Sequence, residues 1–237
     1  NAALQATTVG HSNTAVGSSS LNAITTGDFN VAVGYNAGLA MTTGDRSIAI
    51  GPESLDACTT GQYNIGIGSA ALGSLTTADD NTVIGTNAGA AVTTGASNVA
   101  LGRSALEANQ THSNSTAIGY GALAANVADD NTAVGSGALD ANTTGNGHVA
   151  IGRNALGANT TASENVAVGG NALAAVTTSA ANVAVGYGAL QNNTDEENTA
   201  VGKNAMLDNT SGGYNVAVGS DTLANNTTAD NNTAVGR

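Results

Sequence analysis

Apolar residues recur along this chain in short alternating groups, and each group ends in glycine. Fourteen times a Thr, Val or Ile is followed by a small or β-branched residue, then by Val, Ile or Leu, and then by Gly, as in Val31-Ala32-Val33-Gly34. Apolar positions two apart and rich in β-branched residues predict a short β-strand, because a helix needs a period of 3.6 residues. We expect the Val and Ile side chains to fill the core, with the central Ala on the opposite face.

These glycines follow one another at an interval of seventeen residues, apart from two steps of sixteen. They are Gly17, Gly34, Gly51, Gly68, Gly85, Gly102, Gly119, Gly135, Gly152, Gly169, Gly186, Gly202, Gly219 and Gly236. A fixed period of this size is typical of identical units stacked in one dimension. The sequence therefore predicts one all-β domain over residues 1–237, a parallel β-solenoid of about fourteen coils with seventeen residues each.

The rest of each coil has a second, weaker pattern. Leu usually stands four residues after the glycine, with Ala and Thr at two-residue steps beyond it, as at Leu21, Ala23 and Thr25. This alternation predicts a second, shorter strand facing the first. A Thr-Thr-Gly or acidic loop closes the coil. Both sixteen-residue coils lack one residue there, at 127–130 and 194–197, so we expect the loop to lie at the surface.

Two further repeat positions indicate how neighbouring coils, or neighbouring chains, contact one another. The residue that opens each motif is Asn in eleven copies, which predicts a hydrogen-bonded amide ladder with His148 as a substitute. Seven residues after the glycine stand Ile24, Met41, Cys58, Leu75 and Val92, and mostly Asn later in the chain. If that column faces outward, it leaves an apolar stripe, and both this stripe and the central Ala column favour contact with another chain.

The run Asn131-Thr132-Ala133-Val134-Gly135-Ser136-Gly137-Ala138-Leu139 resembles the head repeats of trimeric autotransporter adhesins of the YadA-like type. Similar repeats occur in phage tail fibres and in long extracellular proteins with an endosialidase-type chaperone domain. The resemblance covers essentially the whole chain, although these coils are longer than the usual adhesin coil. It implies a left-handed β-roll, a homotrimer and attachment at a surface, in an extracellular location on a cell or on a virion fibre.

Composition limits the partners of the chain. The 237 residues carry a net charge of −12 and only five Lys and Arg, which argues against nucleic acid as a partner. No stretch reaches the roughly 20 apolar residues of a membrane span, so we expect no membrane insertion in this segment. Cys58 is expected to be a buried, unpaired thiol. The chain starts without Met, and we expect it to be a segment of a longer protein.

The acidic residues gather five or six positions before the glycines, as at Asp79-Asp80. Such pairs are candidate calcium ligands, but the regular oxygen spacing of a calcium loop is missing. A solvated acidic edge that limits sideways association is the favoured interpretation. We expect neither a metal nor a cofactor.

Most of the rare large side chains share the position directly after the glycine. They form a candidate receptor-binding ridge of Tyr35, Arg103, Tyr120, Arg153, Tyr187 and Lys203. Tyr and Arg offer contact area and hydrogen bonds at modest entropic cost, which suits a host-surface glycan or a protein receptor. The alternative is that a turn position simply admits large side chains.

The pattern favours a non-enzymatic structural and adhesive fibre segment. His11, His112 and His148 occupy different repeat positions, so no nucleophile, base and orienting group come into register for catalysis. Two alternatives stay open. One is a phage tail fibre shaft with a purely structural role, and the other is an ice-binding solenoid that uses the paired threonines, only one of which can point outward.

Overall fold

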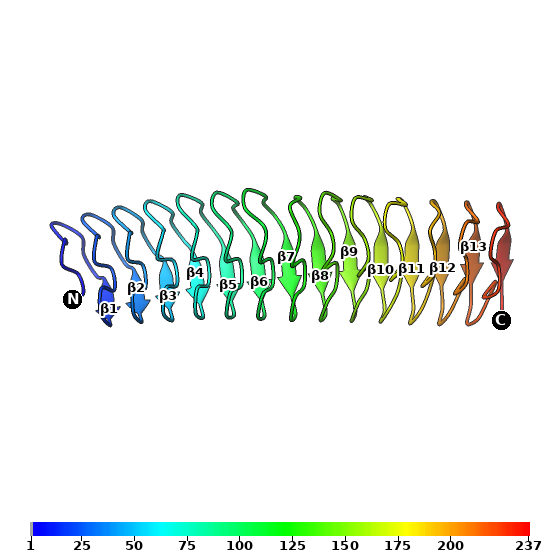
Figure 1. The fold of residues 1–237 in the computed structure, drawn as a ribbon, viewed down its shortest axis with the longest axis horizontal. Coiled ribbons are helices and arrows are strands. Elements are labelled where there is room, and N and C mark those ends of the chain that lie inside the picture. The colour runs from blue at the N-terminus through cyan, green and yellow to red at the C-terminus, as the bar shows by residue number, and fades with distance from the viewer. Residues whose placement is uncertain (1) are drawn as a thin grey trace. The chain divides into compact units, whose positions relative to one another are not determined.

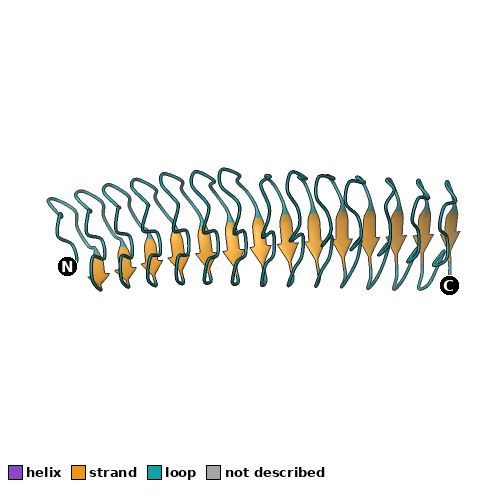
Figure 2. Cartoon of the chain, in the orientation of Figure 1, coloured by secondary structure: helices purple, strands orange, loops and turns teal. Residues whose placement is uncertain are grey.

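The computed structural model describes residues 2–237, and the contacts divide the chain into two compact units. One unit ends at Ser115, and the other spans Thr116–Arg237. Each is a parallel β-solenoid in which successive strands stack, and together they comprise about 13 turns of about 17 residues (Figure 1). Fourteen copies of the motif give thirteen turns because a turn lies between two successive strands. Within residues 2–237 there are only strands, turns and loops (Figure 2).

Every copy of the motif forms one three-residue strand. The strands of the first unit are β1 (Thr14–Val16), β2 (Val31–Val33), β3 (Ile48–Ile50), β4 (Ile65–Ile67), β5 (Thr82–Ile84) and β6 (Val99–Leu101). Those of the second unit are β7 (Thr116–Ile118), β8 (Thr132–Val134), β9 (Val149–Ile151), β10 (Val166–Val168), β11 (Val183–Val185), β12 (Thr199–Val201), β13 (Val216–Val218) and β14 (Thr233–Val235).

Equivalent motif positions pair across neighbouring strands. Val31 is opposite Ile48 in the first unit, and Val166 is opposite Val183 in the second, both in parallel register. Each repeat therefore completes one circuit and places its strand beside the previous one, which confirms the predicted solenoid.

The two faces of the strand are the reverse of the sequence prediction. Ala32 is completely buried, whereas Val33 is 37% exposed, and the same holds in most copies. The inside of the coil is already occupied by the turn leucines: a Cβ on Gly66, the central residue of β4, would lie only 3.2 Å from Cγ of Leu55. Only a small residue fits at most of these central positions, Ala in most copies and Gly at position 66, so the Val and Ile side chains point outward.

Val83 is the one large residue at the central position, and its surroundings make room for it. It lies opposite Gly66 on β4. A Cβ on Gly89 would come within 3.6 Å of the Val83 side chain, so this glycine also leaves space. The added volume of Val83 is therefore compensated by two glycines, as close packing of a core requires.

The predicted second strand is wrong, because the Leu-Ala-Thr segment forms turns. Leu139 has a left-handed backbone with φ of 51°, and its side chain is fully buried. In the first unit Gly38 and Gly89 replace this Leu and have φ of 60° and 54°. Glycine adopts that conformation without steric cost, which explains the two departures from Leu.

The column seven residues after the glycine also faces the interior, so the stripe expected there does not exist. Ile24, Cys58 and Val92 are fully buried in the first unit, as are Asn142 and Asn159 in the second. Apolar side chains thus occupy the first part of this core column and mostly Asn side chains the rest, and the exposed apolar surface comes from the strands instead.

The motif glycine is required at the end of each strand. Its φ ranges from 122° at Gly51 to 144° at Gly85, a region that other residues rarely adopt. In the second unit a Cβ on Gly152 would lie 2.5 Å from the carbonyl oxygen of Gly169 on the next turn. The invariant glycine therefore reflects both its dihedral angle and the close approach of adjacent turns.

Candidate functional site

A ladder of buried Asn residues holds successive turns together. The backbone N–H of Asn81 donates to Oδ1 of Asn64 at 3.1 Å, and Nδ2 of Asn64 donates to the carbonyl of Ala78 at 2.7 Å. The predicted ladder is confirmed, although most of its bonds join a side chain to backbone. His148 is part of it in the second unit, where its backbone N–H donates to Oδ1 of Asn131 at 3.1 Å.

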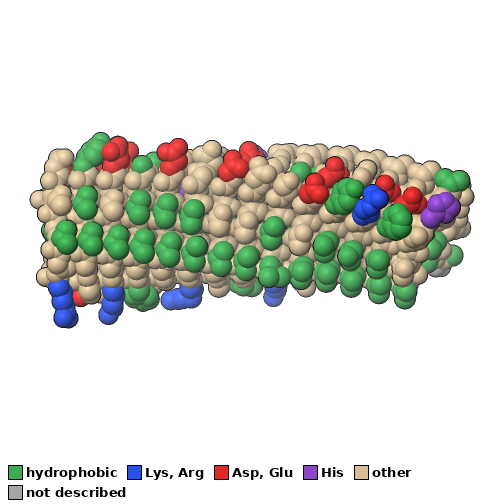
Figure 3. All heavy atoms as spheres, turned by 180° about the vertical axis from the view of Figure 1, so that it is seen from behind, with side chains coloured by type: hydrophobic (Ala, Val, Ile, Leu, Met, Phe, Trp, Pro, Cys, Tyr) green, Lys and Arg blue, Asp and Glu red, His purple; other side chains and the backbone are tan. Residues whose placement is uncertain are grey.

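The strands leave one apolar face uncovered in each unit. The outward side chains form two rows along this face, one of Val, Ile and Leu directly before the glycine and one of Val, Ile and Thr three residues before it. We call this surface the strand face (Figure 3). Its most exposed members away from the terminal strands include Leu101 in the first unit, 44% exposed, and Ile151 in the second, 40% exposed. Contiguous apolar rows of this kind mark a contact surface on a soluble protein.

The candidate receptor-binding ridge lies at the surface of both units. In the first unit Tyr35 and Arg103 are exposed, and in the second Tyr120, Arg153, Tyr187 and Lys203 are exposed. The residue opposite Tyr187 on the preceding turn is Gly170, and a Cβ there would lie 3.3 Å from Cδ2 of Tyr187. The side chains follow one edge within each unit, while their role in binding stays a prediction.

One surface cluster of the first unit was not predicted from the sequence. The guanidinium of Arg46 lies 5.5 Å from the ring centre of Phe29 and 5.6 Å from that of Tyr63. Its Nη1 also donates to the Tyr63 hydroxyl at 3.2 Å. These three residues share the position five before the glycine on successive turns, so sorting the sequence by column could have found the stack. Cation–π contacts at exposed sites contribute about 0.5–1 kcal/mol each.

Part of the acidic edge has a structural role. In the first unit Oδ1 of Asp28 accepts the backbone N–H of His11 at 2.6 Å, and Oδ1 of Asp45 accepts that of Asp28 at 2.7 Å. These carboxylates join consecutive turns as well as carrying charge. The acidic edge is therefore more than a solvated surface.

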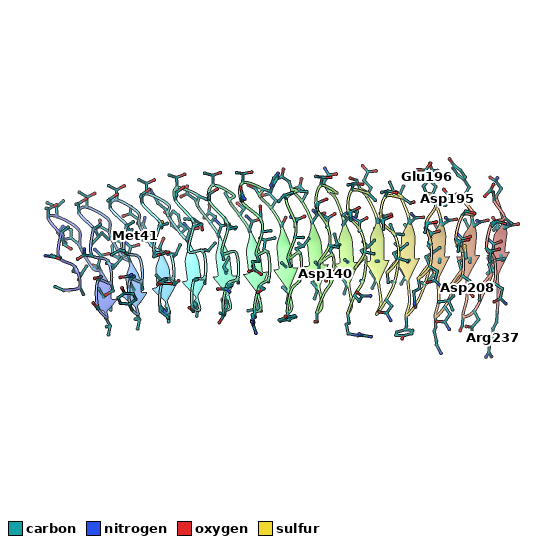
Figure 4. The ribbon with its side chains drawn as sticks, viewed as in Figure 1. Met41, Asp140, Asp195, Glu196, Asp208 and Arg237 are labelled. Atoms are coloured by element: carbon teal, nitrogen blue, oxygen red, sulfur yellow. The ribbon has the colours of Figure 1, made fainter. Side chains whose placement is uncertain are left out.

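In the second unit the acidic loop residues lie at the edge opposite Arg237. Asp195 and Glu196 project from the loops at one edge, and Arg237 lies at the other (Figure 4). The charge of Glu197, followed by that of Glu196, raises the pKa of Tyr214. The hydrogen bond from Asn204 lowers the pKa of Asp221. Of the five basic residues in the sequence, all but Arg46 stand directly after a motif glycine.

The paired threonines divide into an inner and an outer column. In the first unit the hydroxyl of Thr25 donates to the carbonyl of Thr42 at 3.1 Å, and Thr42 donates to Thr59 in the same way. The outer position is an exposed Thr on six successive turns, at Thr26, Thr43, Thr60, Thr77, Thr94 and Thr111, although Gln110 takes the inner position on the last of them. Only the outer column is available to a ligand or to ice.

No chemistry-bearing cluster was found among residues 2–237. They contain no pocket, no group of three His, Cys, Asp or Glu side chains that could hold a metal ion, and no helix long and apolar enough to cross a membrane. Cys58 is fully buried, and burial raises its pKa to about 11. The thiol is therefore protonated and inaccessible at neutral pH.

Comparisons of the chain with protein-family models, with curated proteins and with solved structures found no match. The surfaces of the two units are therefore the basis for a functional proposal.

Proposed function

We propose that this chain is a non-enzymatic structural and adhesive segment of an extracellular fibre, on a cell surface or a virion, built as a homotrimer of left-handed β-rolls. The exposed Val and Ile rows of the strand face carry the proposal. A β-face that leaves Ile151 40% exposed loses favourable burial unless another surface covers it.

A second and a third copy are the best-matched covering surfaces. The rows on every copy have the same spacing, so symmetric association brings apolar residues against apolar residues along each unit. The remaining edges carry Thr, Asp, Glu and the ridge, which suits contact with water. The proposed contact surface is thus the Val and Ile rows, in place of the Ala column and the column seven residues after the glycine that the sequence alone suggested.

Sedimentation equilibrium at micromolar concentration tests the assembly. We expect a mass three times that of the 22.8 kDa chain. A single species with the mass of one chain would contradict the trimer.

The ridge is the proposed attachment surface, and it is tested separately. Binding of the assembled protein to a glycan array is compared with that of a variant carrying Tyr120→Ala and Arg153→Ala. Tyr214→Ala serves as a control, because Tyr214 is 52% exposed outside the ridge. We expect the double variant alone to lose binding. Equal binding by all three proteins would show that the ridge is not the attachment surface. A trimer that binds neither glycan nor protein receptors would favour a purely structural fibre shaft.

The outer threonine column supports ice binding as a second candidate. Six exposed threonines on successive turns of the first unit repeat at the strand spacing of about 4.8 Å. A thermal-hysteresis measurement decides this: we expect activity that falls when Thr60 and Thr77 are replaced by Lys. No hysteresis in the unaltered protein would exclude this function.

A further inference from the structure

His148 is a titratable group inside the Asn ladder of the second unit. It occupies a position that is Asn in eleven of the fourteen copies of the motif, and it is only 1% exposed. An Asn has no proton to gain at physiological pH, whereas an imidazole has an unperturbed pKa near 6.5. The substitution therefore brings a proton-binding group into an otherwise pH-insensitive part of the core.

Both ring nitrogens of His148 have fixed roles. Nδ1 lies 3.2 Å from the backbone N of Asn165, which can only donate, so Nδ1 must accept. Nε2 lies 2.6 Å from the carbonyl oxygen of Ala162, which can only accept, so Nε2 carries the proton. These two neighbours define a neutral imidazole with its hydrogen on Nε2.

A second proton has no acceptor at this site. Placed on Nδ1, it would face the N–H of Asn165, and that hydrogen bond between neighbouring turns would be lost. Nδ2 of Asn159, a further donor, already lies 3.1 Å from Nε2. Because a buried cation without a partner is costly, protonation requires the ring to leave the ladder.

The charged residues on the surrounding turns are too exposed to replace the missing acceptor. Asp129 and Asp130 precede Asn131 on one side, and Glu164 precedes Asn165 on the other; all three side chains are exposed, whereas the ring is buried. Asp140, on the intervening turn, has its own pKa raised by burial. Burial likewise lowers the pKa of His148, while the Ala162 carbonyl acts in the opposite direction.

We propose that His148 is a proton-sensitive joint in the second unit: at neutral pH it substitutes for the ladder Asn, and acidification opens the turns between β9 and β10. The imidazole binds a proton more readily in the open chain than in the closed core. Stability is therefore unchanged above about pH 6.5 and falls as the pH drops below that value towards the lowered pKa of the closed state.

Hydrogen exchange of the assembled protein at pH 7.5 and pH 5.5, corrected for intrinsic rates, tests the joint. We expect the protection of the amides in 149–168 to be lower at pH 5.5 than at pH 7.5, by up to about tenfold. This is the largest change that the uptake of one proton can cause over the single pH unit between 6.5 and 5.5. In His148→Asn, which restores the common ladder residue, protection should be equal at both pH values. His11→Asn, the same change at an exposed site, should respond like the unaltered protein.

Equal pH responses of the His148→Asn variant and the unaltered protein would overturn the joint. Nuclear magnetic resonance provides a second measurement that does not depend on the variant folding. The ring signals of His148 should titrate below pH 6.5, together with a shift of the Asn165 amide. Titration at the ordinary pKa with an unmoved Asn165 amide would also overturn it.

Discussion

Asn159 shows how this core depends on repetition at the scale of single residues. In the second unit successive interior Asn residues are joined by hydrogen bonds: Asn142 donates to Oδ1 of Asn126 at 2.7 Å, and Asn159 donates to Oδ1 of Asn142 at 2.8 Å. The next residue in the column is Val176, and Oδ1 of Asn159 is buried without a hydrogen-bond partner. An unsatisfied buried acceptor costs roughly 1–3 kcal/mol.

Val176→Asn is therefore expected to be nearly neutral, within about 1 kcal/mol, because the new amide can donate to Asn159 and offset the lost apolar burial. Cys58→Asn is the matched control, since Cys58 is also fully buried but its column neighbours Met41 and Leu75 are apolar. It should cost roughly 2 kcal/mol or more. Urea unfolding measures both, and equal losses would show that the amide column does not extend.

The motif glycine gives a second prediction at this scale. Gly152→Ala must place a Cβ 2.5 Å from a backbone oxygen at a φ of 133°, and we expect a loss of about 3 kcal/mol or more in the free energy of unfolding. Gly121→Ala is the control, because its φ is 64° and no atom lies within 4 Å of the added Cβ. It should cost only about 1–2 kcal/mol. A similar loss for both would mean that the contact between turns is unimportant.

At the scale of the element, strand and loop differ in how they tolerate a change of length. In the first of the two sixteen-residue turns of the second unit, Nδ2 of Asn126 donates to the carbonyl of Ala128 at 2.7 Å, two residues away. In a seventeen-residue turn, Asn142 donates to Gly145 at 2.8 Å, three residues away. The shorter turn thus omits the outer, exposed residue of the loop and keeps the core hydrogen bond.

Deletion of Thr161 should accordingly convert its turn to the shorter form and cost no more than about 2 kcal/mol, since one exposed residue and one backbone bond are lost. Deletion of Ala167, the buried centre of β10, shifts the strand by one residue and exchanges its two faces. We expect the second unit to lose its cooperative thermal transition in that variant alone. A Thr161 deletion that is equally disruptive would contradict this view of the loop.

The fold could be predicted from the sequence because the repeat fixes which residues pair. The pairing of Val31 with Ile48 follows from the seventeen-residue interval alone and does not depend on what the strand packs against. The direction of the side chains could not be predicted in the same way. An alternating pattern separates the two faces of a strand but does not say which face is buried. Here the Leu side chains of the turns, whose backbone has a positive φ, already fill the interior of the coil, so the strand can bury only its small central residue. The prediction of a second strand was wrong for a related reason, because the Leu, Ala and Thr residues of the turns also stand two positions apart in the sequence.

The candidate site was predictable only in part. Ridge residues such as Tyr120 were found because their column lies next to the glycine, where turns are exposed. The contact of Arg46 with Phe29 and Tyr63 depends on side-chain geometry between turns, although the shared column could have suggested it. The strand face was missed, because finding it required knowing that Val and Ile point away from the core.

At the scale of the whole molecule, the strand face should determine the assembly. Val185, Val201 and Val218 of the second unit are each 37% exposed on neighbouring strands. Replacing all three by Lys leaves the coil interior unchanged, because these side chains point outward, so each chain should still fold. Three ammonium groups in an apolar contact between copies would have to be desolvated without partners, which association cannot offset. We expect a folded monomer by circular dichroism and sedimentation equilibrium.

The control for this variant introduces the same charge elsewhere. Thr144, Thr161 and Thr178 are exposed on the loops of the same unit, and replacing them by Lys changes the net charge by the same three units without altering the strand face. This variant should keep the mass of the unaltered protein. Because both variants carry equal charge, net charge cannot account for a difference between them. If the Val variant kept the full mass, the copies would associate through another surface, and the exposed Val and Ile rows would need a different partner.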